Sequence, residues 1–258
     1  MTDDTLLLDR DGSVATLTIN RPRRRNALTL EMFTRIPALV KEAAGLPGVR
    51  TLVLRGAGTE AFSAGADITE FQSVRATPDQ AAAHDDAVTA AEDALESFPG
   101  PVIAAIRGFC YGGGCNLALA CDVRYADPGA RLAITPAKLG LVYPLRATKR
   151  LVDLVGPSRA KLILMTGTEL DAPRAAGLGL VDEVHADLDT AVAQLTALLA
   201  VRSPVTQRAV KDTVRRITDG VTHADEAHAA LRAAGLASPD YAEGVRAFLE
   251  RRPPVFTD

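Results

Sequence analysis

The sequence predicts an α/β fold with a helical C-terminal region. Apolar runs of strand length alternate with amphipathic helical patterns over the first two thirds of the chain. Two of these runs, at residues 51–55 and 102–106, lead into stretches rich in glycine and small residues that precede a candidate helix. Because strand and helix units recur along one chain, an α/β architecture is favoured over separate all-β and all-α halves.

Composition and charge narrow the class of protein. The 258 residues are 47% hydrophobic, enough to bury a large core in one domain or in one domain with a small appendage. The net charge of −3 gives no reason to expect nucleic acid or a membrane as a partner. No window has the apolar length of a membrane span, and the first residues lack the features of a signal peptide. The sequence therefore predicts a soluble cytoplasmic protein.

The first elements follow from simple periodicity. Strands are expected near residues 6–9 and 14–20, the second of which alternates apolar and polar side chains. A helix is expected to begin after Thr29, a suitable N-cap, and to end near Gly45. A longer helix is expected over residues 79–97.

From residue 144 onward the pattern is helical almost throughout, with one short strand near residues 181–184. Several of these helices have proline in the first turn, where it is tolerated. The expected helices cover residues 146–155, 157–166, 172–177, 188–201, 204–218, 224–236 and 239–250. We expect an α/β core over residues 1–200 and a helical region over residues 201–258.

The two glycine-rich stretches, residues 63–67 and 111–116, carry the functional prediction. A strand that turns into a helix leaves backbone N–H groups free at the helix N-terminus. Two such turns facing each other could direct two N–H groups at one developing oxyanion. This arrangement favours chemistry on a carbonyl group such as that of a thioester.

The cysteines and histidines offer no metal site by their spacing. Cys110, Cys115 and Cys121 lack zinc-like spacing and a nearby histidine, so buried free thiols are expected. The four histidines fall outside every motif and are expected on the surface: His84, His185, His223 and His228.

Seven short motifs follow one another along nearly the whole chain, at residues 20–22, 26–28, 61–68, 112–115, 120–122, 135–140 and 175–181. With these motifs in this order, the chain resembles the crotonase superfamily, also called the enoyl-CoA hydratase/isomerase family. The resemblance implies a spiral of repeated ββα units with two sheets roughly perpendicular and a helical C-terminal trimerisation region. It also implies a homotrimer or a dimer of trimers.

The resemblance implies an enzyme that binds an acyl-CoA thioester and stabilises an enolate at the thioester oxygen. The two oxyanion-hole donors map to the backbone N–H groups of Ala66 and Gly113. Coenzyme A enters as part of the substrate, and no separate cofactor or metal is implied. The implied CoA-binding positions are Arg24, Arg25, Ala27, Leu28, Ala64, Asp67 and Ile68.

Several of these positions have a second interpretation from the residues themselves. The arginines suit phosphates, but they could also be a run of charged residues exposed to solvent. Asp67 fits a helix N-cap better than a proton carrier. Glu70 follows closely and is a remote candidate for proton transfer, whereas Asp122 is expected to make a structural hydrogen bond.

The chain departs from the family at the two glutamates that hydratases use. The first position is Asn116, and the second is Pro136, or Ala137 in the other gapless register. None of these side chains serves as an acid or base near neutral pH. Hydration by the usual pair of carboxylates is therefore not expected.

Residues 135–143 resemble the corresponding stretch of methylmalonyl-CoA decarboxylases, in which a tyrosine at the position of Tyr143 lies in the active site. Loss of CO₂ forms an enolate without a base, and Tyr143 could orient the carboxylate or donate a hydrogen bond. Those decarboxylases carry a histidine where this chain has Ala66, and Tyr143 could instead be a wall residue bonded to backbone. Hydratase or isomerase (lyase-type) chemistry, decarboxylation and non-catalytic acyl-CoA binding all remain open.

Overall fold

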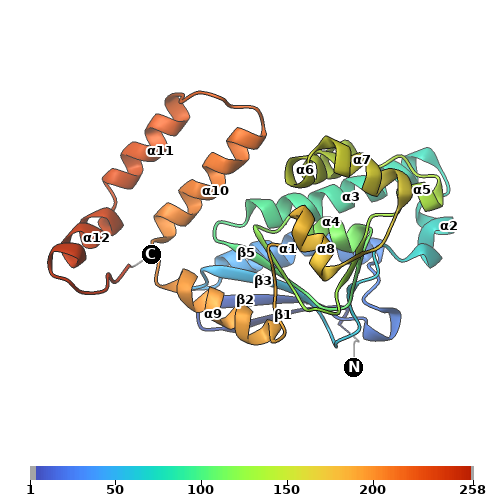
Figure 1. Cartoon of the computed structure of the whole chain (residues 1–258), viewed down its shortest axis with the longest axis horizontal. Coiled ribbons are helices and arrows are strands. Elements are labelled where there is room, and N and C mark those ends of the chain that lie inside the picture. The colour runs from blue at the N-terminus through green and yellow to red at the C-terminus, as the bar shows by residue number, and fades with distance from the viewer. Residues whose placement is uncertain (1–3, 257–258) are drawn as a thin grey trace.

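The computed structural model describes residues 4–256 of the chain. Two β-sheets and the helices around them form the core, and an arm of three helices extends from one side of it (Figure 1). The predicted α/β class and the helical C-terminal region are both confirmed. Within the described part of the chain, no helix combines the length and apolarity needed to cross a membrane.

The larger sheet has six strands in the order β1-β2-β3-β5-β7-β10. β1 pairs antiparallel with β2, and the remaining neighbours are parallel. The strands are β1 (Leu6–Asp11), β2 (Val14–Ile19), β3 (Thr51–Gly56), β5 (Val102–Ile106), β7 (Val123–Ala126) and β10 (Glu183–Val184). Every residue of β5 is buried, as expected for a parallel strand covered on both faces.

The smaller sheet has four strands in the order β4-β6-β8-β9. They are β4 (Ala61–Ser63), β6 (Phe109–Tyr111), β8 (Arg131–Ala133) and β9 (Leu170–Asp171). β4, β6 and β8 each directly follow a strand of the larger sheet, namely β3, β5 and β7. This recurring pair of strands is the repeated unit that the family resemblance implied.

Helices cover both faces of the larger sheet. α9 packs against β3, β5 and β7 on one face, and α1 and α3 pack together over the other. The principal helices of the core are α1 (Leu30–Gly45), α3 (Pro78–Ser97), α4 (Gly113–Leu119), α6 (Leu145–Val155), α7 (Pro157–Thr166), α8 (Ala172–Leu178) and α9 (Leu188–Ala200). Short helices complete it: η1 (Pro22–Arg24), η2 (Ile68–Glu70), α2 (Phe71–Val74) and α5 (Pro136–Leu139). The Thr29 hydroxyl accepts from the Met32 N–H at 3.2 Å, so the predicted N-cap of α1 is confirmed.

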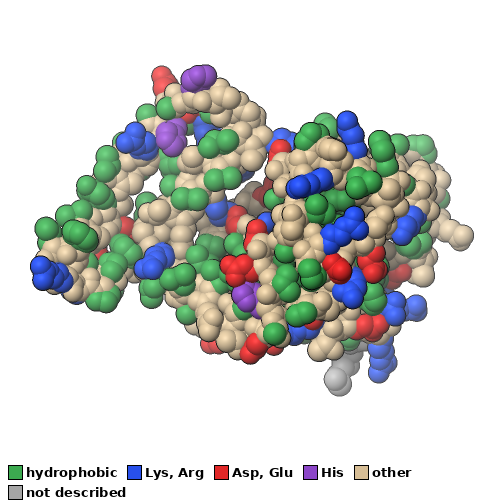
Figure 2. All heavy atoms as spheres, in the orientation of Figure 1, with side chains coloured by type: hydrophobic (Ala, Val, Ile, Leu, Met, Phe, Trp, Pro, Cys, Tyr) green, Lys and Arg blue, Asp and Glu red, His purple; other side chains and the backbone are tan. Residues whose placement is uncertain are grey.

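The arm consists of α10 (Pro204–Thr218), α11 (Glu226–Leu236) and α12 (Pro239–Leu249). A salt bridge of 2.7 Å from Lys211 to Asp122 joins α10 to the core. Asp122 also accepts from the Val102 N–H at 2.7 Å, which confirms its structural role. The space-filling view shows hydrophobic side chains spread along the arm (Figure 2).

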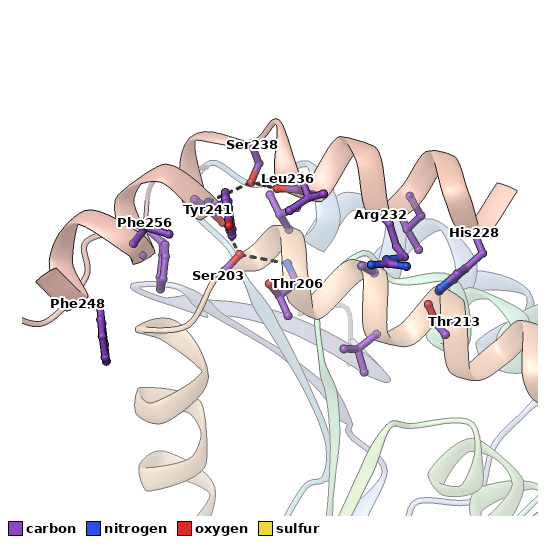
Figure 3. A pocket seen from close by; sticks show the side chains of 18 of the residues that line it. Ser203, Thr206, Thr213, His228, Arg232, Leu236, Ser238, Tyr241, Phe248 and Phe256 are labelled. Atoms are coloured by element: carbon purple, nitrogen blue, oxygen red, sulfur yellow. Dashed lines mark hydrogen bonds between the residues drawn. The ribbon is translucent and has the colours of Figure 1, made fainter. Parts of the chain in front are cut away.

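The three arm helices line an apolar cavity of about 910 Å³ that is open to solvent (Figure 3). Its lining includes Val210 and Val214 from α10, Leu236 from α11 and Phe248 from α12. These four side chains are all more than half exposed. The arm therefore presents an apolar surface that the single chain leaves uncovered.

The prediction for His84 is wrong, while that for the cysteines is confirmed. His84 is 3% exposed, because its ring packs edge-on against the rings of Phe33 and Phe71. Burial and the neighbouring Arg75 lower the pKa of its imidazole. All three cysteines are buried and free.

Asn26 fastens the segment after β2 to the start of the smaller sheet. Its side-chain amide, fully buried, donates to the carbonyls of Ala57 and Ala61 at 3.0 and 2.7 Å and accepts from the Arg21 N–H at 2.9 Å. The Ser63 hydroxyl donates to the Asn26 carbonyl at 2.8 Å. The φ of +56° at Asn26 is left-handed, a conformation that asparagine tolerates better than most residues.

Replacing Asn26 tests how much these hydrogen bonds stabilise the fold. Asn26→Ala leaves two carbonyls and one N–H in the interior without their partner, so we expect the free energy of unfolding to fall by about 2–4 kcal/mol. Urea denaturation of the purified protein measures the change. A loss below about 1 kcal/mol would show that water or another group satisfies those atoms.

Candidate active site

The two glycine-rich turns lie directly against each other. A Cβ placed on Gly65 would lie 3.4 Å from the backbone nitrogen of Gly113. A Cβ placed on Gly113 would lie 3.6 Å from the backbone nitrogen of Ala66. The turn after β4 and the turn after β6 thus bring the two predicted donor amides into one small region.

Both amides are free to bind a ligand. Gly113 is the first residue of α4, where an N–H has no partner inside the helix. The Leu28 N–H donates to the Gly65 carbonyl, and the Leu28 carbonyl accepts from the Asp67 N–H, each at 2.8 Å. Ala66 lies between these two bonds, and its own N–H takes part in neither. Within residues 4–256, neither the Ala66 nor the Gly113 N–H donates a hydrogen bond. Two unpaired donors side by side can both point at one negatively charged oxygen.

Glycine is required for the turns to approach so closely. Gly65 has a φ of +91°, and its added Cβ would lie 2.7 Å from the Tyr111 carbonyl oxygen. A Cβ on Gly114 would lie 2.5 Å from the Cβ of Ser63. Any side chain at either position would push the two turns apart.

The predicted CoA-binding residues come from two segments that run side by side. Ala64 donates to the Arg25 carbonyl at 2.8 Å, and the hydrogen bonds of Leu28 continue the pairing. The Leu28 side chain is 1% exposed and packs in the core, so only its backbone can face a ligand. Ile68 is 58% exposed, and Ala27 lies at intermediate depth.

The two arginines of this region differ in their surroundings. Arg25 pairs with Glu60 at 2.6 Å and lies over the ring of Phe109, 5.0 Å from its centroid. The Arg24 side chain has no ion-pair partner among residues 4–256 and is exposed. Arg24 is therefore the more available cation for an anionic ligand.

Asp67 links the turn after β4 to the segment after β2. It caps η2 by accepting from the Thr69 N–H at 3.2 Å, which confirms the N-cap prediction, and it pairs with Arg21 at 2.9 Å. Partial burial acts to raise the pKa of its carboxyl, but hydrogen bonds from Thr69 and Arg21 outweigh it and the net pKa is lowered. Asp67 is thus ionised and engaged at neutral pH. Glu70 is also engaged, because it accepts from the Leu30 N–H at 3.0 Å.

Tyr143 meets Asn116 one turn into α4. The Tyr143 hydroxyl donates a hydrogen bond to the Asn116 side-chain carbonyl oxygen. Asn116 is 5% exposed, and burial raises the pKa of Tyr143 well above its ordinary value. The expectation of a hydroxyl bonded to backbone is wrong, since the partner is the side chain at the hydratase glutamate position. Pro136 is buried at the start of α5 and Ala137 is exposed.

The sequence reading missed Glu92, a buried carboxylic acid beside this pair. Glu92 lies on α3, is 2% exposed, and forms a salt bridge with Arg150 of α6. Burial raises the pKa of its carboxyl, against the opposing effect of Arg150. Arg150 also pairs with Glu96 and, at 3.4 Å, with Asp93. Acidic residues at helical spacing on α3, matched by arginines on α6, could have signalled this contact.

Substitution of one glycine tests whether the turn contact forms the site. Gly65→Ala places a methyl group against the Tyr111 carbonyl at a left-handed φ, so the Ala66 and Gly113 amides must separate. Because one oxyanion donor is typically worth 10²–10³ in kcat, we expect turnover of an acyl-CoA substrate to fall by at least about 100-fold.

The matched control is Gly177→Ala, at a helical glycine whose added Cβ meets nothing within 4 Å. This change should leave turnover unaltered and stability equal or slightly higher. Equal turnover by Gly65→Ala and wild type would contradict the assignment of the site.

Comparison with known proteins identifies the family. The family model described as enoyl-CoA hydratase/isomerase matches residues 9–258. The 2,3-dehydroadipyl-CoA hydratase of Escherichia coli K12 is 34% identical, with 97% of this chain and 98% of that protein covered. The crotonyl-CoA hydratase of Syntrophomonas wolfei is 32% identical over 99% of both chains.

A solved structure of an enoyl-CoA hydratase/isomerase family protein from Hyphomonas neptunium superposes with a TM-score of 0.95. It is 42% identical, and the match covers 98% of this chain and 97% of that one. The resemblance read from the motifs is therefore confirmed, as is the prediction of an enzyme of this class. The chain belongs to the enoyl-CoA hydratase/isomerase family.

Proposed function

We propose that the protein binds an acyl-CoA thioester and stabilises the negative charge that develops on the thioester oxygen with the N–H groups of Ala66 and Gly113. The observation that carries this proposal is the pair of unpaired amides held side by side by the two turns. Preorganised donors of this kind stabilise an enolate without reorganisation during the reaction.

The CoA portion would lie along residues 24–28 and 64–68. Arg24 offers an exposed guanidinium suited to a phosphate, and Arg25 is a second cation on the same segment. The backbone of Ala27, Leu28 and Ala64 would form the surface beneath the pantetheine. CoA serves here as part of the substrate.

Lyase or isomerase chemistry through an enolate is the reaction class we favour. Asn116 and Pro136 replace the usual carboxylates, so a proton must move through another group or through water. Glu92 on α3 is a buried carboxyl group, but it is paired with Arg150.

Decarboxylation of a malonyl-type thioester is the second candidate. The absence of a titratable side chain at Asn116 and Pro136 favours it, because loss of CO₂ forms the enolate without a base. A protein that binds acyl-CoA without converting it is the remaining alternative.

An assay of two substrates decides among these functions. We expect measurable turnover of crotonyl-CoA, with kcat well below that of paired-carboxylate hydratases because one or both acid–base steps lack their side chain, each typically worth 10²–10⁴. Release of CO₂ from methylmalonyl-CoA, lost in Tyr143→Phe, would establish the decarboxylase instead. Calorimetric binding of both thioesters without conversion would establish a binding protein, and no binding at all would refute the proposal.

The apolar surface of the arm supports assembly. Exposed valine, leucine and phenylalanine side chains on α10, α11 and α12 surround the cavity shown in Figure 3. A surface of this kind is typical of an interface between subunits. We propose a homotrimer or a dimer of trimers, which sedimentation equilibrium would detect, whereas a monomer at micromolar concentration would exclude both.

A further inference from the structure

The Ala66 N–H belongs to the same peptide unit as the Gly65 carbonyl. This unit is trans, and a trans unit is planar, with its N–H and C=O pointing in opposite directions. The Gly65 carbonyl accepts from the Leu28 N–H at 2.8 Å. That hydrogen bond therefore fixes the plane of the peptide and the direction in which the Ala66 N–H points. It also polarises the unit, which makes the N–H a stronger donor.

Residues 25–28 hold the peptides on either side of this unit as well. The Ala64 N–H donates to the Arg25 carbonyl at 2.8 Å. The Asp67 N–H donates to the Leu28 carbonyl, also at 2.8 Å. The direction of the donor amide between them thus depends on where residues 25–28 lie.

Residues 24–27 form a tight turn that carries two exposed arginines. The Ala27 N–H donates to the Arg24 carbonyl at 3.0 Å and closes the turn. Its central residues are both left-handed, with φ of +50° at Arg25 and +56° at Asn26. Asparagine tolerates this conformation, whereas arginine adopts it at a cost in energy. A ligand that holds the arginines in place therefore also stabilises the turn and the residues that follow it.

We propose that binding of the CoA nucleotide to the arginines of this turn aligns the Ala66 N–H with the thioester oxygen, through the Leu28 N–H. The inference rests on the proposed acyl-CoA function. Leu28 is a positioning residue in this account, because its N–H acts on the ligand only through the peptide that joins Gly65 to Ala66. Binding energy from a part of the substrate that does not react is thereby used at the reacting carbonyl.

The test compares butyryl-CoA with S-butyl-CoA, a thioether that lacks only the carbonyl oxygen. Both ligands carry the same nucleotide and a chain of the same length, so the ratio of their dissociation constants reports the hydrogen bonds to that oxygen. In the wild-type protein, calorimetry should show a preference of about 25-fold for the thioester, the effect of two net hydrogen bonds. A ratio near one would mean that the Ala66 and Gly113 amides do not meet the oxygen, and the proposed function itself would fail.

Arg24→Gln weakens the hold of the nucleotide on the turn. The Arg24 side chain is exposed and has no ion-pair partner among the residues that the structure describes, so the variant should fold normally. Both CoA ligands should bind more weakly, and the preference for the thioester should fall to about fivefold because only one donor stays aligned. Equal weakening of both ligands, with the preference unchanged, would overturn the inference.

Two ligands without the nucleotide, S-butyryl-pantetheine and S-butyl-pantetheine, separate this coupling from damage to the turn. The wild-type protein and Arg24→Gln should show the same preference for the thioester, about fivefold, because no nucleotide aligns the Ala66 amide in either protein. A lower preference in Arg24→Gln than in wild type with these short ligands would show that the substitution itself disturbs the site, which contradicts the coupling.

A backbone substitution tests the link itself. Replacing Leu28 by its α-hydroxy acid, 2-hydroxy-4-methylpentanoic acid, converts the N–H into an ester oxygen and keeps the side chain. The Gly65 carbonyl then loses its donor, so the preference for butyryl-CoA should fall to about fivefold while S-butyl-CoA binds as in wild type. Adding Arg24→Gln to this variant should weaken both CoA ligands equally. A preference of wild-type size in the ester variant would refute the role of Leu28.

Arg159→Gln is the matched control. Arg159 is exposed on α7, and no ion pair involves it within the described part of the chain. The same loss of charge there should leave the preference for the thioester unchanged. A loss of preference in this variant as well would show that net charge, and not the turn at residues 24–27, sets it, and the inference would fail.

Discussion

Close backbone contact between the turn at residues 63–67 and the turn at residues 111–114 is the constraint on which the site depends. At Gly65 an ordinary side chain would lie 2.7 Å from the Tyr111 carbonyl, and at Gly114 it would lie 2.5 Å from Ser63. Only glycine lets the two strand ends meet. The smaller sheet enforces the meeting, because β4 and β6 are paired neighbours in it and each delivers one turn. The free amides of Ala66 and Gly113 follow from this geometry.

Around this contact, side-chain hydrogen bonds fasten the two turns to neighbouring segments of the chain. Asn26 fixes the segment that flanks the first turn through three hydrogen bonds of its buried side chain. Asn116 belongs to the helix that the second turn opens, and its partner Tyr143 comes from the segment before α6. The bonds of Asn26 thus fasten the segment beside the first turn, and the bond from Tyr143 to Asn116 fastens the helix that follows the second turn.

Much of this arrangement could be predicted from the sequence, for identifiable reasons. The strands β2, β3 and β5 are mostly apolar, and proline or a capping residue marks most helix starts, so the limits of these elements can be predicted within a few residues. β7, with four residues, was not predicted. β9 has only two residues and β4 only three, too few for periodicity to appear. The family resemblance implied a second sheet, but the residue pattern did not locate its strands. Glu92 and His84 look like surface residues of an amphipathic helix, and their burial depends on partners distant in sequence, such as Arg150 and Phe33.

The carbonyl stretch of a bound thioester tests the central claim most directly. Butyryl-CoA labelled with ¹³C at the thioester carbonyl has no carbon–carbon double bond and no leaving group on its β carbon, so it is neither hydrated nor eliminated. Its carbonyl infrared band reports polarisation of that oxygen. Two amides converging on the oxygen should shift the band to clearly lower frequency than in water. A bound ligand whose band stays at or above its frequency in water would contradict the account, because the Ala66 and Gly113 donors would then point elsewhere.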